Sequence, residues 1–80
     1  MEILYTPHAV ERMMQRKISP REVELLLSNP DGTIQQSMDK FIYYKQIKGR
    51  KDNALAAVTV KIANQSFEVI TVMVNFEIPK

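Results

Sequence analysis

Apolar residues recur every three or four positions in the first third of the chain, whereas in the second half they alternate with polar residues or form short runs. The longer period predicts amphipathic helices, and the alternation predicts strands. We therefore expect an α+β domain in which two N-terminal helices pack on one face of an antiparallel sheet of three to four strands.

Residues 7 to 16 or 17 carry the signals of a first helix. The Thr6 side chain can cap its N-terminus, and proline is favoured at the first helical position, where an N–H would have no partner. A second helix is expected to begin at Ser19-Pro20-Arg21-Glu22, because serine followed by glutamate three positions later forms a capping box. It should end before Asn29-Pro30-Asp31-Gly32, which has the composition of a turn.

The remaining segments are rich in β-branched and aromatic residues and predict strands. The expected strands are residues 33–37, 41–47, 55–62 and 67–76, with turns at 48–53 and 63–65. The last of these strands is apolar on both faces, which is typical of a central strand covered on two sides. Near the N-terminus, Ile3-Leu4-Tyr5 is either an edge strand or an ordered lead-in to the first helix.

The composition is that of one globular domain, with 80 residues, 45% of them hydrophobic and 25% charged. A chain of this length forms only a thin core. It has no cysteine, so it forms neither a disulfide nor a zinc–thiolate site, as is common in a reducing cytosol. No signal peptide pattern or apolar run of about 20 residues is present, so we expect a cytoplasmic protein with no membrane partner.

Positive charge is concentrated in the second half of the chain, although the net charge is only +2. The expected turn at 48–53 holds three cations around one glycine, namely Lys48, Arg50 and Lys51. Such a cluster attracts phosphate groups. The alternative is a solvated hairpin loop without a ligand.

Three basic side chains recur at every fourth position of the first predicted helix: His8, Arg12 and Arg16. On a helical wheel they form one stripe that borders the buried face. Cations placed in a row repel one another, and a phosphate-bearing ligand would relieve that repulsion. Alternatively, the arginines cover the apolar edge with their stems or pair with nearby glutamates, and His8 is merely solvated.

The strand 41–47 offers a second group of polar and aromatic side chains. Tyr43 and Lys45 are expected on one face and Tyr44 on the other, because side chains alternate along a strand. Aromatic rings beside a cation can stack a base and hold a phosphate. The alternative is that one tyrosine belongs to the core and Lys45 is solvated. Thr71 is a polar break in an apolar strand, which β-propensity alone also explains.

Several classes of site are disfavoured. A single histidine and scattered carboxylates lack the spacing of a metal site, and two isolated glycines do not form a phosphate-binding loop. We therefore expect neither a metal nor a cofactor. A conventional metabolic enzyme is also not expected, because so short a chain has little room for a substrate pocket.

The chain also resembles a bacterial family called domain of unknown function 4258. The resemblance rests on a "His-Ala-x-x-Arg-Met-x-x-Arg-x-Ile-Ser" opening, here residues 8–19, and on the later segments Tyr43-Tyr44-Lys45 and Val69-Ile70-Thr71-Val72. Many members have a glycine where this chain has Lys17. The helix-then-sheet layout is similar to that of RelE/ParE-like and barnase-like RNA-cleaving toxins.

That similarity implies a metal-independent endoribonuclease of a toxin–antitoxin system. His8 would be the general acid or base, Arg12, Arg16 and Lys45 would hold the phosphate, and Tyr44 or Thr71 would position the leaving group. The RNA-binding residues would be Lys48, Arg50, Lys51 and Tyr43. Expected partners are free or ribosome-bound RNA, an antitoxin protein and a second copy of the chain. The alternative is a non-catalytic module that binds nucleic acid or protein.

Overall fold

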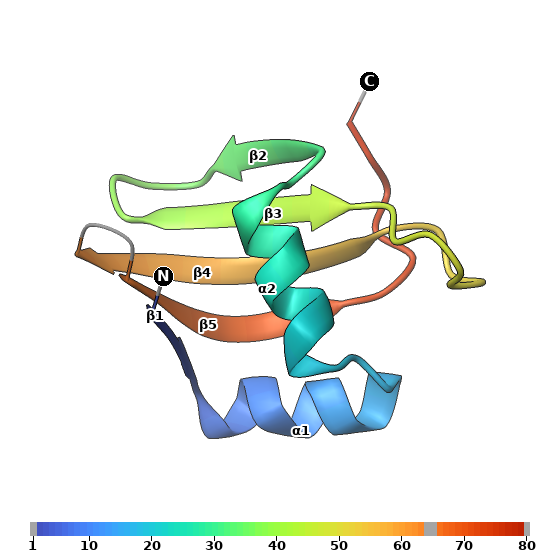
Figure 1. Cartoon of the computed structure of the whole chain (residues 1–80). Coiled ribbons are helices and arrows are strands. Elements are labelled where there is room, and N and C mark those ends of the chain that lie inside the picture. The colour runs from blue at the N-terminus through green and yellow to red at the C-terminus, as the bar shows by residue number, and fades with distance from the viewer. Residues whose placement is uncertain (1, 64–65, 80) are drawn as a thin grey trace.

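In chain order, two helices follow the first strand and precede the other four strands (Figure 1). The computed structural model describes residues 2–63 and 66–79. The elements are β1 (Glu2–Tyr5), α1 (Pro7–Arg16), α2 (Pro20–Ser28), β2 (Gly32–Gln35), β3 (Lys40–Lys45), β4 (Leu55–Ala63) and β5 (Ser66–Met73). The α+β class and both helices are confirmed.

The helix ends follow from local capping, as the sequence predicts. The Thr6 side chain accepts a hydrogen bond from the Ala9 N–H at 3.1 Å. Ser19 and Glu22 form the complete capping box, with each side chain bonded to the other residue's backbone N–H. Helix α1 ends at Arg16 and is capped by Lys17, which adopts a left-handed conformation with φ 56°. The chain then turns directly into α2.

The sheet has five strands in the order β1-β5-β4-β3-β2. The prediction of three to four antiparallel strands was therefore wrong on the strand count and on one pairing, because β1 pairs with β5 in parallel. Of the two alternatives for Ile3-Leu4-Tyr5, the edge strand is correct. Its partner begins 64 positions later, at Ser66, and a segment of four residues carries no local sign of such a distant pairing.

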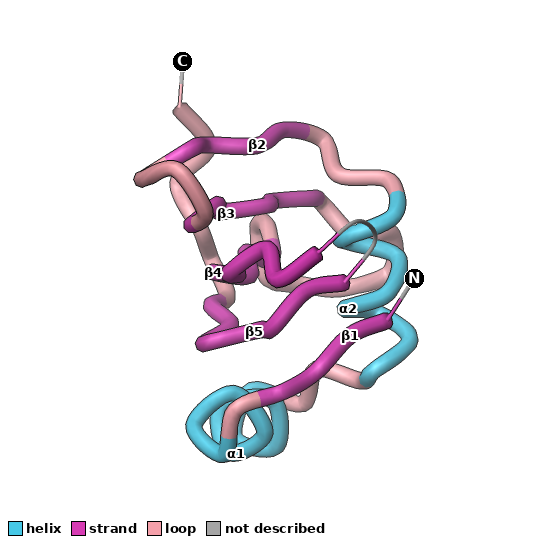
Figure 2. The backbone as a smooth tube through the Cα atoms, turned by 90° about the vertical axis from the view of Figure 1, so that its left-hand side faces the viewer, coloured by secondary structure: helices cyan, strands magenta, loops and turns pink. Residues whose placement is uncertain are grey.

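One face of the sheet is covered by α2, whereas α1 lies along the sheet edge next to β5 (Figures 1 and 2), so the expectation of both helices on one face holds for α2 alone. Helix α2 lies across β3 and β4, and α1 lies beside β5 (Figure 2). The buried core joins the inner sides of both helices to β4 and β5, through residues such as Ala9, Val23, Leu26, Leu55 and Val69. We call the opposite side of the sheet the open face.

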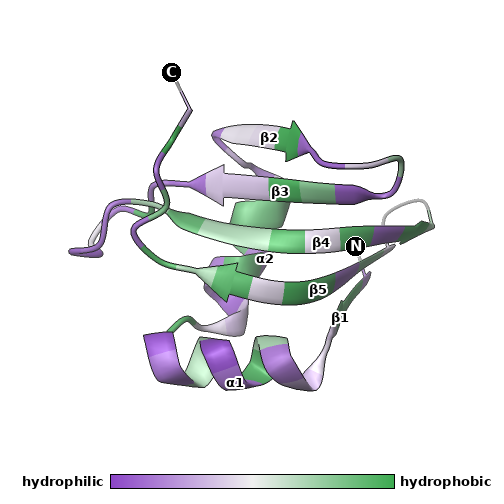
Figure 3. Cartoon of the chain, turned by 180° about the vertical axis from the view of Figure 1, so that it is seen from behind, coloured by the Kyte–Doolittle hydropathy of each residue, from purple (hydrophilic) through white to green (hydrophobic). Residues whose placement is uncertain are grey.

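The open face carries an apolar row from β4, and the chain that follows β5 crosses one end of it (Figure 3). One row of β4, Ala56, Val58 and Val60, lies on this face, because Leu55 and Ala57 point into the helix-covered core. The crossing segment is fixed where the Phe76 N–H donates to the Ala54 carbonyl oxygen at 3.0 Å.

Strand β5 lies between β1 and β4, as expected for an interior strand. However, β1 pairs only with its first half, from Ser66 to Val69, and α1 packs beside it. The turn predicted at 63–65 includes residues 64 and 65, which lie outside the described residues. Within the described chain, neither helix has the length and apolar character needed to span a membrane.

Candidate functional site

The basic stripe predicted on the first helix is present on α1. Ala9 and Met13 are buried against the core, and the stripe lies along the neighbouring side of the helix. The Arg12 Nε donates to the His8 Nε2 at 3.4 Å, and the Arg12 guanidinium also donates to the Gln15 Oε1 at 3.4 Å. His8 is exposed and Arg12 half-buried, so this pair is accessible to a ligand.

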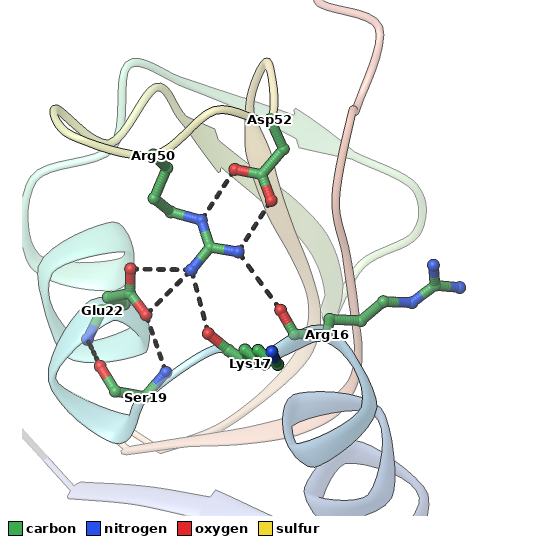
Figure 4. Close-up of polar contacts among 6 residues, drawn as sticks. All are labelled: Arg16, Lys17, Ser19, Glu22, Arg50 and Asp52. Atoms are coloured by element: carbon green, nitrogen blue, oxygen red, sulfur yellow. Dashed lines mark hydrogen bonds and ion pairs between the residues drawn. The ribbon is translucent and has the colours of Figure 1, made fainter.

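Arg16 occupies the last turn of α1 and has two separate roles. Its side chain is exposed and extends away from the neighbouring polar cluster (Figure 4). Its backbone carbonyl oxygen accepts a hydrogen bond from the Arg50 guanidinium at 3.3 Å. The charged group therefore remains free to meet a ligand while the backbone of the same residue is held in place.

Arg50 lies at the centre of a polar cluster that joins three segments of the chain (Figure 4). Its guanidinium pairs with Asp52 at 2.7 Å and with Glu22 at 3.0 Å, and it donates to the Lys17 carbonyl oxygen at 3.1 Å. The planar guanidinium suits such multiple contacts. This cluster fixes the β3–β4 loop, residues 46–54, against the corner between α1 and α2.

The same contacts shift the pKa values within the cluster. Hydrogen bonds and charge, first from Asp52 and then from Glu22, raise the pKa of Arg50 although burial opposes the rise. The hydrogen bond from Arg50 lowers the pKa of Asp52. Burial alone would raise the pKa of Glu22, but hydrogen bonds from Ser19 and Arg50 outweigh it and lower the value. The cluster is thus a set of permanently charged groups at neutral pH.

Arg50 was predicted to bind RNA, but its guanidinium is already engaged by acceptors of the protein itself. Its side chain is 17% exposed, so we leave it out of the candidate site. Its contacts instead bring the loop that carries Lys48 and Lys51 to the C-terminal end of α1. Four exposed cations then gather there, and we call them the basic end: Arg16, Lys17, Lys48 and Lys51.

The predicted strand residues separate onto the two faces of the sheet. Tyr43 lies on the helix-covered face, in an edge-to-face contact with Phe67 at a ring distance of 5.8 Å. Burial raises the pKa of Tyr43. Lys45 shares this face and pairs with Asp31 at 3.4 Å. The hydrogen bond from the Gln46 N–H, followed by Lys45, lowers the pKa of Asp31.

Tyr44 and Thr71 lie on the open face but far apart. Tyr44 is on β3, and its phenol lies over Gly32 on the outer strand β2. Thr71 is on β5, opposite Val58 of β4. Two strand spacings, about 10 Å, separate the two strands. Of the strand residues proposed for catalysis, only Thr71 is on the strand that packs against α1.

A family model described as a domain of unknown function (DUF4258) matches residues 5–74. The chain belongs to this family. The resemblance seen in the opening motif is thereby confirmed, and the DUF4258 match extends from Tyr5 through α1 and α2 to the end of β5. No significant match is found among curated proteins or solved structures.

The described part of this DUF4258 domain contains no group of three or more histidine, cysteine, aspartate or glutamate side chains that could hold a metal ion. Its polar chemistry is instead that of cations, with the His8–Arg12 pair at one end of α1 and the basic end at the other. His8 and Arg16 are eight positions apart, which is about 12 Å along the helix axis. This surface has the length and the charge to contact successive phosphates of a nucleic acid.

Two residues matter in ways that the sequence interpretation missed. Arg50 acts within the protein, which no local pattern indicates, because its partners come from distant segments. Phe76 was assigned to the end of a strand but lies beyond β5, after Asn75 at φ 54°. Its ring stacks on Tyr44 with a centroid distance of 5.5 Å. Asparagine adopts the left-handed conformation more readily than most residues. Asn75 was therefore a weak signal that the strand ends before Phe76.

Proposed function

We propose that this DUF4258 domain is a toxin-type endoribonuclease that needs no metal ion and binds the RNA backbone along α1 and the basic end. The observation that carries the proposal is the Arg50 clamp on the Lys17 carbonyl oxygen. It brings the two loop lysines to the helix end where Arg16 and Lys17 already lie. Separate cations thereby become one surface that continues the stripe from His8.

Cleavage of RNA can proceed without a cofactor, because the neighbouring 2′-hydroxyl attacks the phosphorus and the 5′-oxygen leaves. The reaction needs a proton acceptor, a proton donor and stabilisation of the charge on the phosphorane. The Nε2 of His8 accepts a hydrogen bond from Arg12, so this nitrogen presents a lone pair, which becomes available to a substrate proton when Arg12 turns to the phosphate. Arg12 then lies beside the reacting phosphate, where its charge stabilises the transition state.

Three of the residues predicted for catalysis receive different support. Thr71 is kept as the strand residue that could position the leaving group, because β5 packs beside α1. Lys45 is paired with Asp31 on the other face of the sheet, and the Tyr44 phenol lies over Gly32. We therefore do not assign either of them to the reaction.

The test is incubation of purified protein with total cellular RNA, and separately with translating ribosomes, in the presence of EDTA. His8→Ala and Arg12→Ala should each lower the cleavage rate about 100-fold or more, in the range of general acid–base catalysis. Arg21→Gln is the matched control, since it removes an exposed cation of α2 outside the stripe. Cleavage that persists in both folded stripe variants, or is absent from the parent in both assays, would overturn the proposal.

A protein-binding module is the second candidate, and the apolar open face favours it. Ile62 is 54% exposed at the end of β4, and Val58 and Val60 are only half-buried. An antitoxin or a second copy of the chain would cover such a face. Size-exclusion chromatography with light scattering, together with capture of an encoded neighbour protein, would identify this function if no RNA is bound or cleaved.

A further inference from the structure

Two aromatic rings stack on the open face beside the β3–β4 loop. The Tyr44 and Phe76 rings are 5.5 Å apart between centroids, with 29° between their planes. The separation lies within the range that aromatic pairs favour. Both residues are half-buried. Each side chain is therefore packed against the protein on one side and accessible to solvent on the other.

The pair is held in place from both sides. Tyr44 can lie flat across the sheet because Gly32 has no side chain, and a Cβ at this position would overlap the phenol. The Phe76 N–H donates to the Ala54 carbonyl oxygen at 3.0 Å, and the Asn53 amide donates to the Phe76 carbonyl oxygen at 3.1 Å. These two hydrogen bonds fix the backbone of Phe76, and the fixed backbone holds its ring against Tyr44.

The same loop connects this pair to the basic end. Within this loop, Arg50 is bonded to the end of α1. Asn53 is bonded to the segment after β5, where its backbone N–H donates to the Asn75 Oδ1 at 3.1 Å. Lys51 lies between Arg50 and Asn53 in this loop, and Lys48 lies two positions before Arg50. The end of α1, the loop and the segment after β5 thus meet at one end of the sheet (Figures 1 and 3).

We propose that the Tyr44–Phe76 pair is a stacking platform for one base of a single-stranded RNA whose neighbouring phosphates contact Lys48 and Lys51. Tyr44 covers one side of the Phe76 ring, and the base stacks on the other side. Single-strand binding sites combine cations that follow the backbone with aromatic rings that accept a base. A duplex would not use such a platform, because its bases are already paired and stacked. This inference rests on the proposed function only in taking RNA as the ligand.

The test uses a short oligouridine with 2′-O-methyl groups, which cannot undergo cleavage by its own 2′-oxygen. Its dissociation constant is measured by fluorescence anisotropy. Phe76→Leu should weaken binding about 5- to 100-fold, the range for loss of one stacked base, and Phe76→Trp should bind at least as tightly as the parent. Phe41→Leu is the matched control, because Phe41 contacts Tyr43 on the helix-covered face.

An oligonucleotide with one abasic position, scanned along the strand, separates stacking from a general effect on the fold. At the position that meets the platform, the difference between the parent and Phe76→Leu should disappear. The inference is overturned if Phe76→Leu binds like the parent, if its loss is the same at every abasic position, or if the parent binds no oligonucleotide. If the parent binds RNA through Phe76 but cleaves none, only the nuclease proposal is refuted. If cleavage depends on His8 and Phe76→Leu leaves KM unchanged, only the platform is refuted.

Discussion

The Arg50 guanidinium donates to the Lys17 carbonyl oxygen at 3.1 Å across 33 positions of sequence. Lys17 follows the last residue of α1, where backbone carbonyl groups lack partners within the helix. A cation at this point satisfies such a carbonyl and opposes the negative end of the helix dipole. Through Glu22, the same cation also reaches the first turn of α2. One side chain therefore fixes the corner between the two helices.

Replacing Arg50 should strongly destabilise the domain. Arg50→Met leaves Glu22 and Asp52 half-buried without their cation, and we expect the free energy of unfolding to fall by about 2–4 kcal/mol. Urea denaturation followed by circular dichroism measures this change. Lys51→Met is the control, since an exposed neighbour should change stability by less than about 0.5 kcal/mol. Equal losses in the two variants would contradict the clamp.

Acid should weaken the same cluster. The pKa values of Glu22 and Asp52 are lowered in the folded protein, so their stabilisation is present above the ordinary carboxyl values, 4.5 and 3.8. It is lost as pH falls through the lowered values. Urea midpoints between about pH 7 and about pH 3 should decline more steeply in the parent than in Arg50→Met. Parallel declines would show that these carboxylates are not linked to Arg50.

A side chain at position 32 should disturb the open face. The Tyr44 phenol occupies the place of a Cβ at Gly32, so Gly32→Ala forces the ring to move and should cost about 1–3 kcal/mol of stability. Thermal unfolding measures the loss, and Thr33→Ala is the control on the same strand. Combined with Tyr44→Ala, the change at Gly32 should cost much less than it does alone. Additive losses would indicate that the ring and Gly32 are independent.

The basic end predicts a specific dependence of RNA binding on salt. Each phosphate contact contributes about 0.7 to the slope of log affinity against log salt for a single strand. The double variant Lys48→Gln/Lys51→Gln should therefore lower the slope by about 1.4. Lys61→Gln is the matched control, because Lys61 is an exposed lysine near the end of β4, away from the loop. If Lys61→Gln lowers the slope as much as a loop lysine does, binding is diffuse.

The features predicted correctly from the sequence are those that depend on neighbours in the chain. Ser19 and Glu22 are three positions apart, and their capping box begins α2 as expected. The stripe that includes His8 and Arg12 follows from helical periodicity alone. The parallel pairing of β1, in contrast, depends on a strand 64 positions away.

The contacts of Arg50 and Tyr44 likewise depend on residues that are distant in the sequence. Arg50 is bonded to Glu22 from 28 positions away, and Tyr44 is stacked on a ring beyond the end of β5. Charge and aromatic character indicated that these residues could meet RNA. Whether an arginine faces solvent or its own protein depends on the tertiary fold, which a local pattern does not contain.

The first strand of this domain cannot pair until the last strand has been synthesised. The β1 partner on β5 extends from Ser66 to Val69, and the backbone N–H of Thr6 donates to the Val69 carbonyl oxygen just before α1 begins. A nascent chain that has not reached this point therefore lacks the support on which α1 rests. Contacts so distant in sequence also slow folding. The histidine and arginines of α1 come into position only after the ribosome has translated β5, so a partly made chain has no assembled surface with which to act.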